Sequence, residues 1–493
     1  MGTEPAAHVV LLASPGAGHL LPMVEFARRV VAHGGGDGAE FTATLVTYTN
    51  FSSASHHYSS TLASLPPSVS TAVLPEVPLD DLPADARVET RIFTMVKRAL
   101  PHLRDLLSSL LASSPAGVAA FVPDILSAWA LDVSTELGVP GYVFSPSNLT
   151  ALHSLLYMPQ LDETTACEFR DLPEPIRLPG CVPLRGADLG DPFQDRANPT
   201  YAFMVELGRK HLLADGFVVN TLDALEHDTI AAFRTLSHSG VYPPAYAAGP
   251  FVRTCSGGEA AAAERSSLLL RWLDEQPDRS VLYVCLGSGG TLSTEQMAEL
   301  AAGLEASRQR FLWMVRFLPS DKDDDRSASY LGGGHGDNPL GYLPEGFVER
   351  TRATGLAVTE WTPQVEVLNH RAVGGFLSHC GWNSTLETVA AGVPTLAWPL
   401  YAEQRMNAVI LSEQVGLALR LGGSGNKGKD GVLVPREEVA AAVTELMVGE
   451  KGAAARARAR ELRDAAAEAW APDGPSRKAF EAVAGKWKKV IKG

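Results

Sequence analysis

The sequence predicts an α/β protein made of two Rossmann-like domains, each built on a parallel sheet, that face each other across a cleft. Short apolar runs alternate with segments of helical periodicity along most of the chain, which is the pattern of a doubly wound sheet. The chain has 493 residues, whereas a single hydrophobic core stops growing at roughly 250–300 residues. A stretch rich in Gly, Ala and Ser divides the sequence near its middle, as an interdomain linker would.

The expected first domain covers residues 1–251, and the linker covers residues 252–264. A first buried strand at residues 8–13 leads through a glycine turn into a helix over residues 20–31. Further strands are expected at residues 41–47, 118–122, 141–144 and 217–220, with a long helix over residues 89–111 and another helix after Ser127.

The expected second domain covers residues 265–475, and residues 476–493 form a last amphipathic helix. Ser293 and Gln296 have the spacing of a capping box at a helix start. Residues 318–343 are rich in Gly, Asp and Ser without periodicity, so we interpret them as a mobile surface loop. Strands are expected at residues 280–286, 311–315 and 374–378, helices over residues 435–470, and the apolar face of the last helix at Phe480, Val483, Trp487 and Val490.

Composition excludes several classes of function. The net charge of -14 and the pI of about 5.4 argue against a nucleic acid or an anionic membrane as partner. The five cysteines are odd in number and not closely spaced, so they indicate neither a disulfide framework nor a zinc site and favour a reducing cytosol. No apolar run is long enough to span a membrane, and the N-terminus lacks the features of a signal peptide. We therefore expect a cytoplasmic protein without integral membrane association. We also expect a monomer, although the sequence itself does not determine the oligomeric state.

The stretch from residue 361 to residue 404 has the composition of a nucleotide site. Its apolar strand at residues 374–378 is followed by a turn and by a helix that starts at Trp382. Asn383 and Ser384 then lie at the helix N-terminus, where free backbone N–H groups and the helix dipole favour a phosphate. Glu387 lies one turn further on the same face, and its carboxylate could accept hydrogen bonds from two ribose hydroxyls.

Side chains that suit a base and a sugar flank this phosphate site. Trp361 and Gln364 follow one strand and could offer a stacking ring and an amide to a base. Glu403 and Gln404 follow another strand, and a carboxylate beside an amide suits adjacent sugar hydroxyls. The alternative is a plain strand–helix–strand unit with caps and core tryptophans, but that alternative explains the combined pattern less well.

The first glycine turn does not match a dinucleotide-binding enzyme. Gly16 and Gly18 follow a strand, but Leu21 stands where the third glycine of that motif belongs. The second strand ends in Thr47, Tyr48 and Thr49, with no acidic side chain for a ribose hydroxyl. A nicotinamide enzyme is therefore disfavoured.

His19 stands in that turn, at the carboxyl end of a strand where such sheets place ligands. A lone histidine is more often structural, yet a partner is available in Asp124, which follows the strand at residues 118–122. A carboxylate on one ring nitrogen would fix the tautomer, and the other nitrogen could then take a proton from a hydroxyl.

Two rival sites are disfavoured. His379 and Cys380 are adjacent, so as strand residues they would point to opposite faces and could not act as base and nucleophile. The acidic run from Asp321 to Asp325 lies in the long polar loop and is better explained as solvated charge than as a metal site. We expect no metal and no other cofactor, with the charge of a leaving diphosphate met by the helix N-terminus, His379, Asn383 and Ser384.

Residues 361–404 resemble, end to end and without gaps, the signature box of the plant UDP-dependent glycosyltransferases. The Gly-x-Gly-His turn and an Asp about a hundred residues later are similar to that family's catalytic His–Asp pair. The segments at residues 161–164, 180–183, 287–292 and 401–407 resemble the hydroquinone (arbutin synthase-type) and monolignol branch. The resemblance implies the GT-B fold, in which the last helix crosses back onto the first domain.

The resemblance also implies an activity. It is inverting transfer of glucose from UDP-glucose, a co-substrate, to the hydroxyl of a small phenol in plant secondary metabolism, giving a β-glucoside. His19 would be the general base and Asp124 its partner. Two alternatives stay open: transfer to the nitrogen of aromatic amines at the same site, and a non-catalytic UDP-sugar-binding protein, against which the intact His19 and Asp124 argue.

The implied binding residues are carried over position by position. In the donor site, Trp361 stacks on uracil, the backbone of Thr362 and Gln364 reads its edge, and Glu387 binds ribose. The phosphates would be bound by Ser288, His379, Asn383 and Ser384, with Gly381 in the same turn. The sugar would be bound by Trp382, Glu403 and Gln404, and a Gln at the last of these positions favours glucose. Asn148 stands near the sugar where relatives carry Ser or Thr. By position, the acceptor residues are Ser14, Glu89, Ile92, Leu126 and Leu155.

Overall fold

The computed structural model describes residues 6–33, 41–50, 59–114, 116–253, 268–287, 290, 292–316, 339–421 and 433–492. The chain forms two compact units, which we describe separately. Unit 1 comprises Met1–Gly186, Pro192–Val252 and Ala467–Gly493. Unit 2 comprises Ala187–Asp191 and Arg253–Ala466. The short stretch Ala187–Asp191 therefore belongs to unit 2, although the chain on either side of it belongs to unit 1.

The strands of unit 1 are all parallel. Four of them lie in the order β3-β2-β1-β4, and three more in the order β5-β6-β7. Parallel bridges from Phe121 to Gly141 and from Asp124 to Phe144 join β4 to β5. The strands are β1 (Ala7–Leu12), β2 (Phe41–Tyr48), β3 (Val69–Leu74), β4 (Val118–Pro123), β5 (Tyr142–Ser145), β6 (Gly216–Val219) and β7 (Ala245–Ala247).

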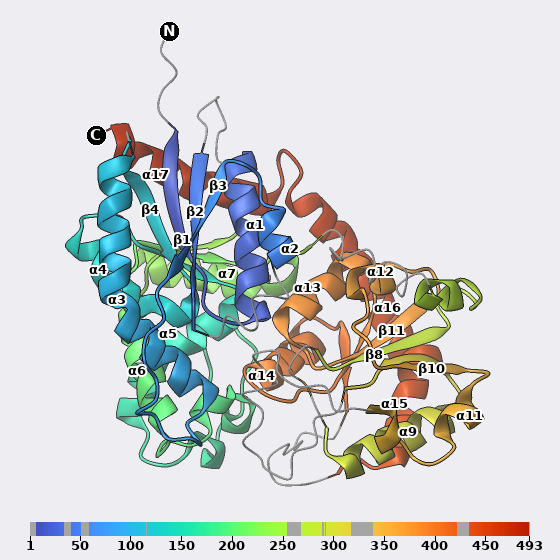
Figure 1. Ribbon diagram of the computed structural model, residues 1–493. Coiled ribbons are helices and arrows are strands. Elements are labelled where there is room, and N and C mark those ends of the chain that lie inside the picture. Colours follow the sequence, from blue (N-terminus) through green and yellow to red (C-terminus); the bar gives the residue numbers. More distant parts are fainter. Residues whose placement is uncertain are drawn as a thin grey trace. The chain divides into compact units, whose positions relative to one another are not determined.

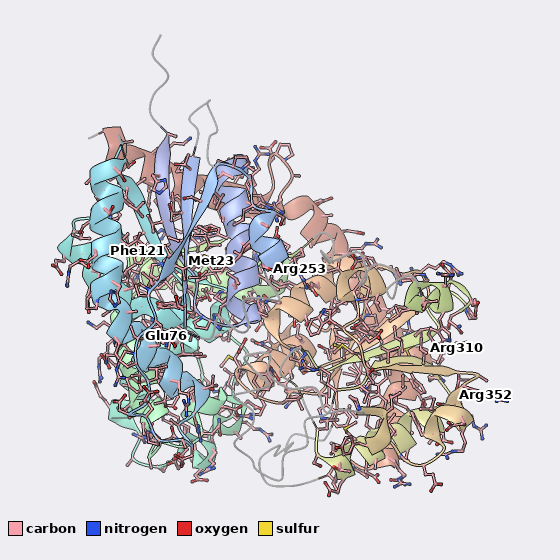
Figure 2. All side chains as sticks on the ribbon, in the orientation of Figure 1. Met23, Glu76, Phe121, Arg253, Arg310 and Arg352 are labelled. Atoms are coloured by element: carbon pink, nitrogen blue, oxygen red, sulfur yellow. The ribbon has the colours of Figure 1, made fainter. Side chains whose placement is uncertain are left out.

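Helices cover this sheet because their apolar stripes face it. In the first helix Leu20, Val24, Phe26 and Val30 are all buried, as their spacing predicts. Figure 2 labels Met23 and Phe121, two fully buried side chains of this unit. The helices are α1 (Ala17–His33), α2 (Ser59–Ala63), α3 (Val88–Ser113), α4 (Leu131–Glu136), α5 (Leu149–Thr164), α6 (Pro199–His211), α7 (Asp223–His238) and α17 (Pro475–Lys492), with short 3₁₀ turns at Ile125–Ala130 and Phe169–Asp171. Two further 3₁₀ turns, Gly186–Asp188 and Asp191–Phe193, each include residues assigned to unit 2.

The C-terminal helix α17 completes the core of unit 1. Figure 1 shows it, in dark red, beside the blue strands of the N-terminal region. Phe480, Val483 and Trp487 are fully buried, and the Trp487 ring meets the rings of Phe26 and Phe41 edge-on. Val490, which we expected on the same apolar face, is 46% exposed, because it lies in the last turn beyond the core.

Unit 2 contains one six-stranded sheet, again parallel, in the order β10-β9-β8-β11-β12-β13. The central strand β11 is buried along its whole length, which explains its continuous apolar run. The strands are β8 (Val281–Cys285), β9 (Arg310–Met314), β10 (Gly355–Val358), β11 (Val373–Ser378), β12 (Thr395–Ala397) and β13 (Ala418–Arg420).

The helices of unit 2 include the one that the nucleotide motif predicts, since α13 starts at Trp382. The set is α9 (Thr294–Ser307), α11 (Phe347–Thr351), α12 (Gln364–Leu368), α13 (Trp382–Ala391), α14 (Gln404–Val409), α15 (Arg436–Val448) and α16 (Glu450–Ala469), whose last residues belong to unit 1, with a 3₁₀ turn at Pro339–Tyr342 and a π turn at Ile410–Gln414. The α/β fold class with parallel sheets is thus confirmed.

Three local predictions need correction or lie partly outside the described residues. Ser293 caps α9 as expected, but the Gln296 side chain does not return to it and instead pairs with the backbone of Val434. Cys380 is not a strand residue, because it follows β11 in the left-handed conformation with φ +63°. Of the loop expected at residues 318–343, residues 318–338, including the acidic run, lie outside the described residues.

Candidate active site

In each unit, several candidate site residues follow strands whose carboxyl ends share one edge of a parallel sheet. In unit 1 the register pairs Leu12 with Pro123, so the segments carrying His19 and Asp124 leave the sheet side by side. In unit 2 the register pairs Ser378 with both Cys285 and Ala397. Each unit therefore gathers its own candidate residues at the edge where doubly wound sheets bind ligands.

Asp124 contacts the Nδ1 atom of His19 with both carboxylate oxygens, at 2.9 and 3.0 Å. The carboxylate is fully buried, and the imidazole is 14% exposed. Asp124 also caps the following 3₁₀ turn, where its Oδ1 accepts a hydrogen bond from the Leu126 N–H at 3.0 Å. Because this cap fixes the carboxylate, the contact with Asp124 in turn holds the His19 ring through Nδ1.

Two hydroxyls that the sequence did not single out lie beside this pair. The Ser127 hydroxyl lies 2.8 Å from the Ser14 hydroxyl and 3.2 Å from that of Tyr48. Burial raises the pKa of Tyr48, and the nearby Asp124 carboxylate raises it further, so the phenol is neutral. The sequence offered one signal for Ser127 as a neighbour of this pair: it lies three residues after Asp124, in the turn that Asp124 caps.

The residues expected to line an acceptor pocket are only partly accessible. Ser14, Ile92 and Leu155 are buried, whereas Glu89 and Leu126 are half-buried. The structure brings Ser14 and Leu126 close to the His19–Asp124 pair through the contacts above. Glu89 and Ile92 lie together near the start of α3, and Leu155 lies in α5. Their acceptor roles stay a prediction.

Asn148 has a clear local function as the N-cap of α5. Its Oδ1 accepts a hydrogen bond from the Ala151 N–H at 2.7 Å, and the residue is fully buried. The adjacent N–H groups of Leu149 and Thr150 donate to the buried carboxylate of Glu226. The predicted contact between Asn148 and a sugar remains a prediction.

In unit 2, His379 is packed against two glycines. A Cβ atom at Gly287 or Gly381 would lie only 2.5 or 2.4 Å from His379 Nε2, so the ring needs both glycines. Burial lowers the pKa of His379 to about 4, which makes the imidazole neutral near pH 7. Its buried Nδ1 has no hydrogen-bond partner among the described residues. A neutral ring beside a helix start is suited to contact a ligand by hydrogen bonding.

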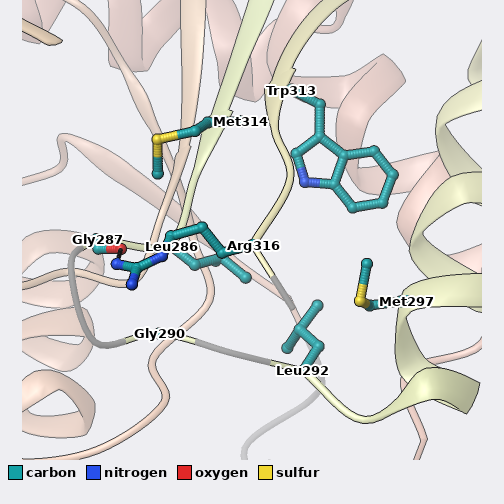
Figure 3. Close-up of a pocket in the computed structure, with 8 residues that line it drawn as sticks. All are labelled: Leu286, Gly287, Gly290, Leu292, Met297, Trp313, Met314 and Arg316. Atoms are coloured by element: carbon teal, nitrogen blue, oxygen red, sulfur yellow. Dashed lines mark hydrogen bonds between the residues drawn. The ribbon is translucent and has the colours of Figure 1, made fainter. Parts of the chain in front are cut away.

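A small pocket adjoins this histidine at the ends of β8 and β9. Figure 3 shows its lining: Leu286, Gly287, Gly290, Leu292, Met297, Trp313, Met314 and Arg316. The Arg316 guanidinium donates to the Gly287 carbonyl at 3.4 Å. Ser288, a predicted phosphate contact, belongs to the same loop but lies outside the described residues.

Glu387 is already engaged by two side chains. Its Oε2 accepts a hydrogen bond from Gln364 Nε2 at 2.7 Å, and its Oε1 lies 3.2 Å from the Arg253 guanidinium, which Figure 2 labels. The same Gln364 nitrogen donates to the Ser384 hydroxyl at 3.0 Å. The sequence suggested that the Gln364 amide or its backbone would contact a base, and in this structure the amide nitrogen is bonded to Glu387 and Ser384. The sequence gave no signal for Arg253, which stands at the start of the linker.

The residues expected around a base differ sharply in exposure. Trp361 is 60% exposed, although indole rings are usually largely buried. Thr362 is buried, and its hydroxyl pairs with that of Tyr283 at 2.5 Å. An exposed ring held by a fixed neighbour is a suitable stacking surface for a planar ligand.

Glu403 and Gln404, the predicted sugar contacts, lie at the start of α14. The Gln404 Oε1 accepts hydrogen bonds from the N–H groups of Leu400 and Tyr401. The Tyr401 side chain also hydrogen-bonds the Gln404 side chain. Glu403 lies 3.5 Å from the amide nitrogen of Asn407, which also donates to the Cys380 carbonyl. Trp382 is buried at the start of α13, where Asn383 and Ser384 follow it.

The described residues contain neither a candidate metal cluster nor a membrane-spanning helix. No group of three or more His, Cys, Asp or Glu side chains in this part of the chain could hold a metal ion. No helix described here is both long and apolar enough to cross a membrane. The metal-free reaction expected from the sequence stays a prediction.

Comparison with known proteins identifies the family. The family model described as "UDP-glucoronosyl and UDP-glucosyl transferase" matches residues 250–423. The chain is 43% identical to the hydroquinone glucosyltransferase of Rauvolfia serpentina, over 99% of each chain. It is 45% identical to UDP-glycosyltransferase 72B1 of Arabidopsis thaliana, over 98% of this chain and 96% of that protein.

Solved structures give the same result. A Phytolacca americana glycosyltransferase, UGT2, complexed with UDP-2fluoro-glucose and pterostilbene, matches with a TM-score of 0.85 and 40% identity over 99% of this chain and 100% of that one. A Polygonum tinctorium UDP-glucosyltransferase capable of glucosylating indoxyl, in complex with 3,4-dichloroaniline, matches with a TM-score of 0.86 and 42% identity over the same shares. The fold is therefore GT-B, and the protein is a glycosyltransferase. The chain belongs to the plant UDP-glycosyltransferase family.

Proposed function

We propose that the protein transfers glucose from UDP-glucose to the hydroxyl of a small phenol, with inversion, to give a β-glucoside. The observation that carries this proposal is the contact between the buried Asp124 carboxylate and Nδ1 of His19. An imidazole held in this way presents Nε2 as a general base, and the carboxylate stabilises the imidazolium that forms. The relatives named for hydroquinone, pterostilbene and indoxyl support an aromatic acceptor.

The proposed reaction is a single displacement. His19 Nε2 takes the phenolic proton while the phenol oxygen forms a bond to the anomeric carbon of glucose. The bond from that carbon to the UDP oxygen breaks, and UDP leaves with the electron pair. One displacement through an oxocarbenium-like state inverts the α-linked donor to a β-glucoside.

The donor is assigned to side chains of unit 2. Trp361 would stack on uracil, Glu387 would accept from ribose hydroxyls, and His379 with the α13 N-terminus would hold the diphosphate without a metal. Glu403 and the Gln404 amide would read the glucosyl hydroxyls. The spacing of the cysteines supports a cytosolic, reducing site of action.

A direct assay tests the proposal. The protein is incubated with UDP-glucose and a panel of phenols that includes hydroquinone and a monolignol, while UDP release and product mass are followed. A product heavier by one glucosyl group, with a β linkage by NMR, is expected. UDP-glucose binding without transfer to any acceptor would favour a non-catalytic UDP-sugar-binding protein.

Transfer to nitrogen is the second candidate. The Polygonum tinctorium relative was solved with 3,4-dichloroaniline, an aromatic amine. The same His19 could take the proton that an aniline nitrogen loses as it bonds to the sugar. Adding 3,4-dichloroaniline to the panel tests this candidate, because that amine has no hydroxyl and its glucosyl product can only be an N-glucoside.

A further inference from the structure

The turn that carries Glu403 and Gln404 contains a residue in an unfavourable backbone conformation. Ala402 has a φ of +53°, in the left-handed region that residues with a Cβ atom rarely adopt. Such a conformation persists only where the surrounding structure holds it in place. Gln404 holds the turn from within, since its Oε1 accepts from the N–H groups of Leu400 and Tyr401.

Asp191 holds the same turn from outside. Its Oδ2 accepts a hydrogen bond from the Ala402 N–H at 2.9 Å, across 211 residues of sequence. In return, the Asp191 N–H donates to the Ala402 carbonyl at 3.1 Å. Both polar backbone groups of the left-handed residue are therefore paired with one residue from a distant part of the chain.

Arg405 fixes Asp191 in turn. Its guanidinium donates to Asp191 Oδ1 at 2.6 Å and to the carbonyls of Ala187 and Leu189 at 3.0 and 3.2 Å. The two side chains are only 12% and 13% exposed, so water screens the ion pair weakly. Ala187–Asp191 belongs to unit 2, as does Arg405, which directly follows Gln404 in α14.

We propose that Asp191 is a positioning residue for recognition of the donor sugar. By holding Ala402 in its left-handed conformation, Asp191 sets the direction in which the next two residues, Glu403 and Gln404, present their side chains. The proposal rests on the proposed function, in which those two residues contact the glucosyl hydroxyls. Uracil, ribose and the diphosphate are assigned to other side chains, so Asp191 should affect binding of the sugar and not of UDP.

The experiment compares binding of UDP-glucose, UDP-galactose and UDP by calorimetry, without acceptor, in the full-length protein. In Asp191→Ala the affinity for UDP-glucose should fall about tenfold, as expected when one charge-assisted hydrogen bond is lost. The preference for UDP-glucose over its C4 epimer should fall with it, whereas the Kd for UDP should stay within about twofold of wild type. The KM for UDP-glucose should rise by the same factor.

Two further variants keep the test decisive. Asp188→Asn is the matched control, because Asp188 lies in the same stretch but pairs with Arg420 at 3.5 Å and does not contact the turn. It should leave all three affinities unchanged. Asp191→Asn keeps an acceptor for the Ala402 N–H but loses the ion pair, so it should show an intermediate effect, and it replaces the alanine variant if that one does not fold.

The outcomes separate this proposal from the proposed function. Wild-type affinity and sugar preference in both Asp191 variants would overturn the positioning role. An equal loss of affinity for UDP and UDP-glucose would also overturn it, since it would show a general structural defect. Failure of the wild-type protein to glucosylate any acceptor would instead contradict the proposed function, while the binding comparison would still test Asp191.

Discussion

The two candidate centres differ in how a key carboxylate is engaged. In unit 1, fully buried Asp124 contacts His19 and caps a turn, and nothing in the proposed reaction requires either bond to break. In unit 2, both oxygens of Glu387 are taken by Gln364 and Arg253, which ribose hydroxyls would have to replace or share. In the proposed reaction, the His19 base would therefore be arranged before substrates bind, whereas Glu387 would have to exchange internal hydrogen bonds for ligand contacts.

The largest effect is expected from breaking the centre in unit 1. His19→Ala should lower kcat by about 10²–10⁴-fold, the usual contribution of a general base, because the phenolic proton then has no acceptor. The Kd for UDP should not change. His227→Ala is the matched control, since His227 pairs with an aspartate as well but is 72% exposed on the surface of α7. Near-normal turnover of His19→Ala would contradict the assignment of the base.

Each unit contains a buried histidine that should make its stability depend on pH. Burial lowers the pKa of His211 in unit 1 and of His379 in unit 2 to about 4. Between pH 6.5 and 4 the unfolded chain binds a proton at each position that the folded protein does not, so stability falls as the pH drops through this window. On going from pH 7 to pH 5, each of these two histidines should raise the equilibrium constant for unfolding by about twentyfold.

Urea unfolding midpoints at the two pH values measure this effect. The midpoint should be lower at pH 5, and His211→Gln should reduce the difference for unit 1, because glutamine does not titrate. His227 serves as the internal contrast, since its aspartate partner raises its pKa and gives the opposite sign. An identical pH dependence in His211→Gln and wild type would contradict the prediction.

A smaller effect is expected from displacing His379 in unit 2. In Gly381→Ala the added Cβ atom would meet Nε2 of the ring at 2.4 Å, so the imidazole must move. We expect the Kd for UDP to rise about tenfold, the equivalent of one good hydrogen bond to a charged group, with His19 unaffected. Gly485→Ala in α17 is the control, because nothing lies within 4 Å of its Cβ position. An unchanged Kd for UDP in Gly381→Ala would contradict the proposal that His379 binds the donor.

The smallest effect concerns the exposed ring. Trp361→Ala should weaken UDP binding roughly fivefold, the lower end for loss of one base–aromatic stack. It should barely change the unfolding midpoint, since the ring is 60% exposed. Val448→Ala, at another exposed apolar residue of unit 2, should leave both quantities unchanged. A large loss of stability in Trp361→Ala would indicate a structural ring.

Much of each centre could be predicted because the relevant signals are local. The apolar run of β11 and the helical spacing after Trp382 predicted where α13 starts, and strand ends brought His19 and Asp124 to one edge of a sheet. Contacts across long sequence distances could not be predicted. Gln296 pairs with Val434 instead of closing its capping box, and Arg253 reaches Glu387, since neither partner lies near in sequence.

By itself the sequence determined the α/β class, the strand–turn–helix at the nucleotide motif and the family, because periodicity, caps and motif spacing are encoded over a few residues. How the candidate site residues are held follows from the tertiary structure alone. Asp191 supports the turn at Ala402 from 211 residues away in the sequence. Gly287 and Gly381, which are also far apart in the sequence, both leave space for the His379 ring. The physical reason is that such contacts depend on which strand ends and loops the fold brings together, and not on local propensity.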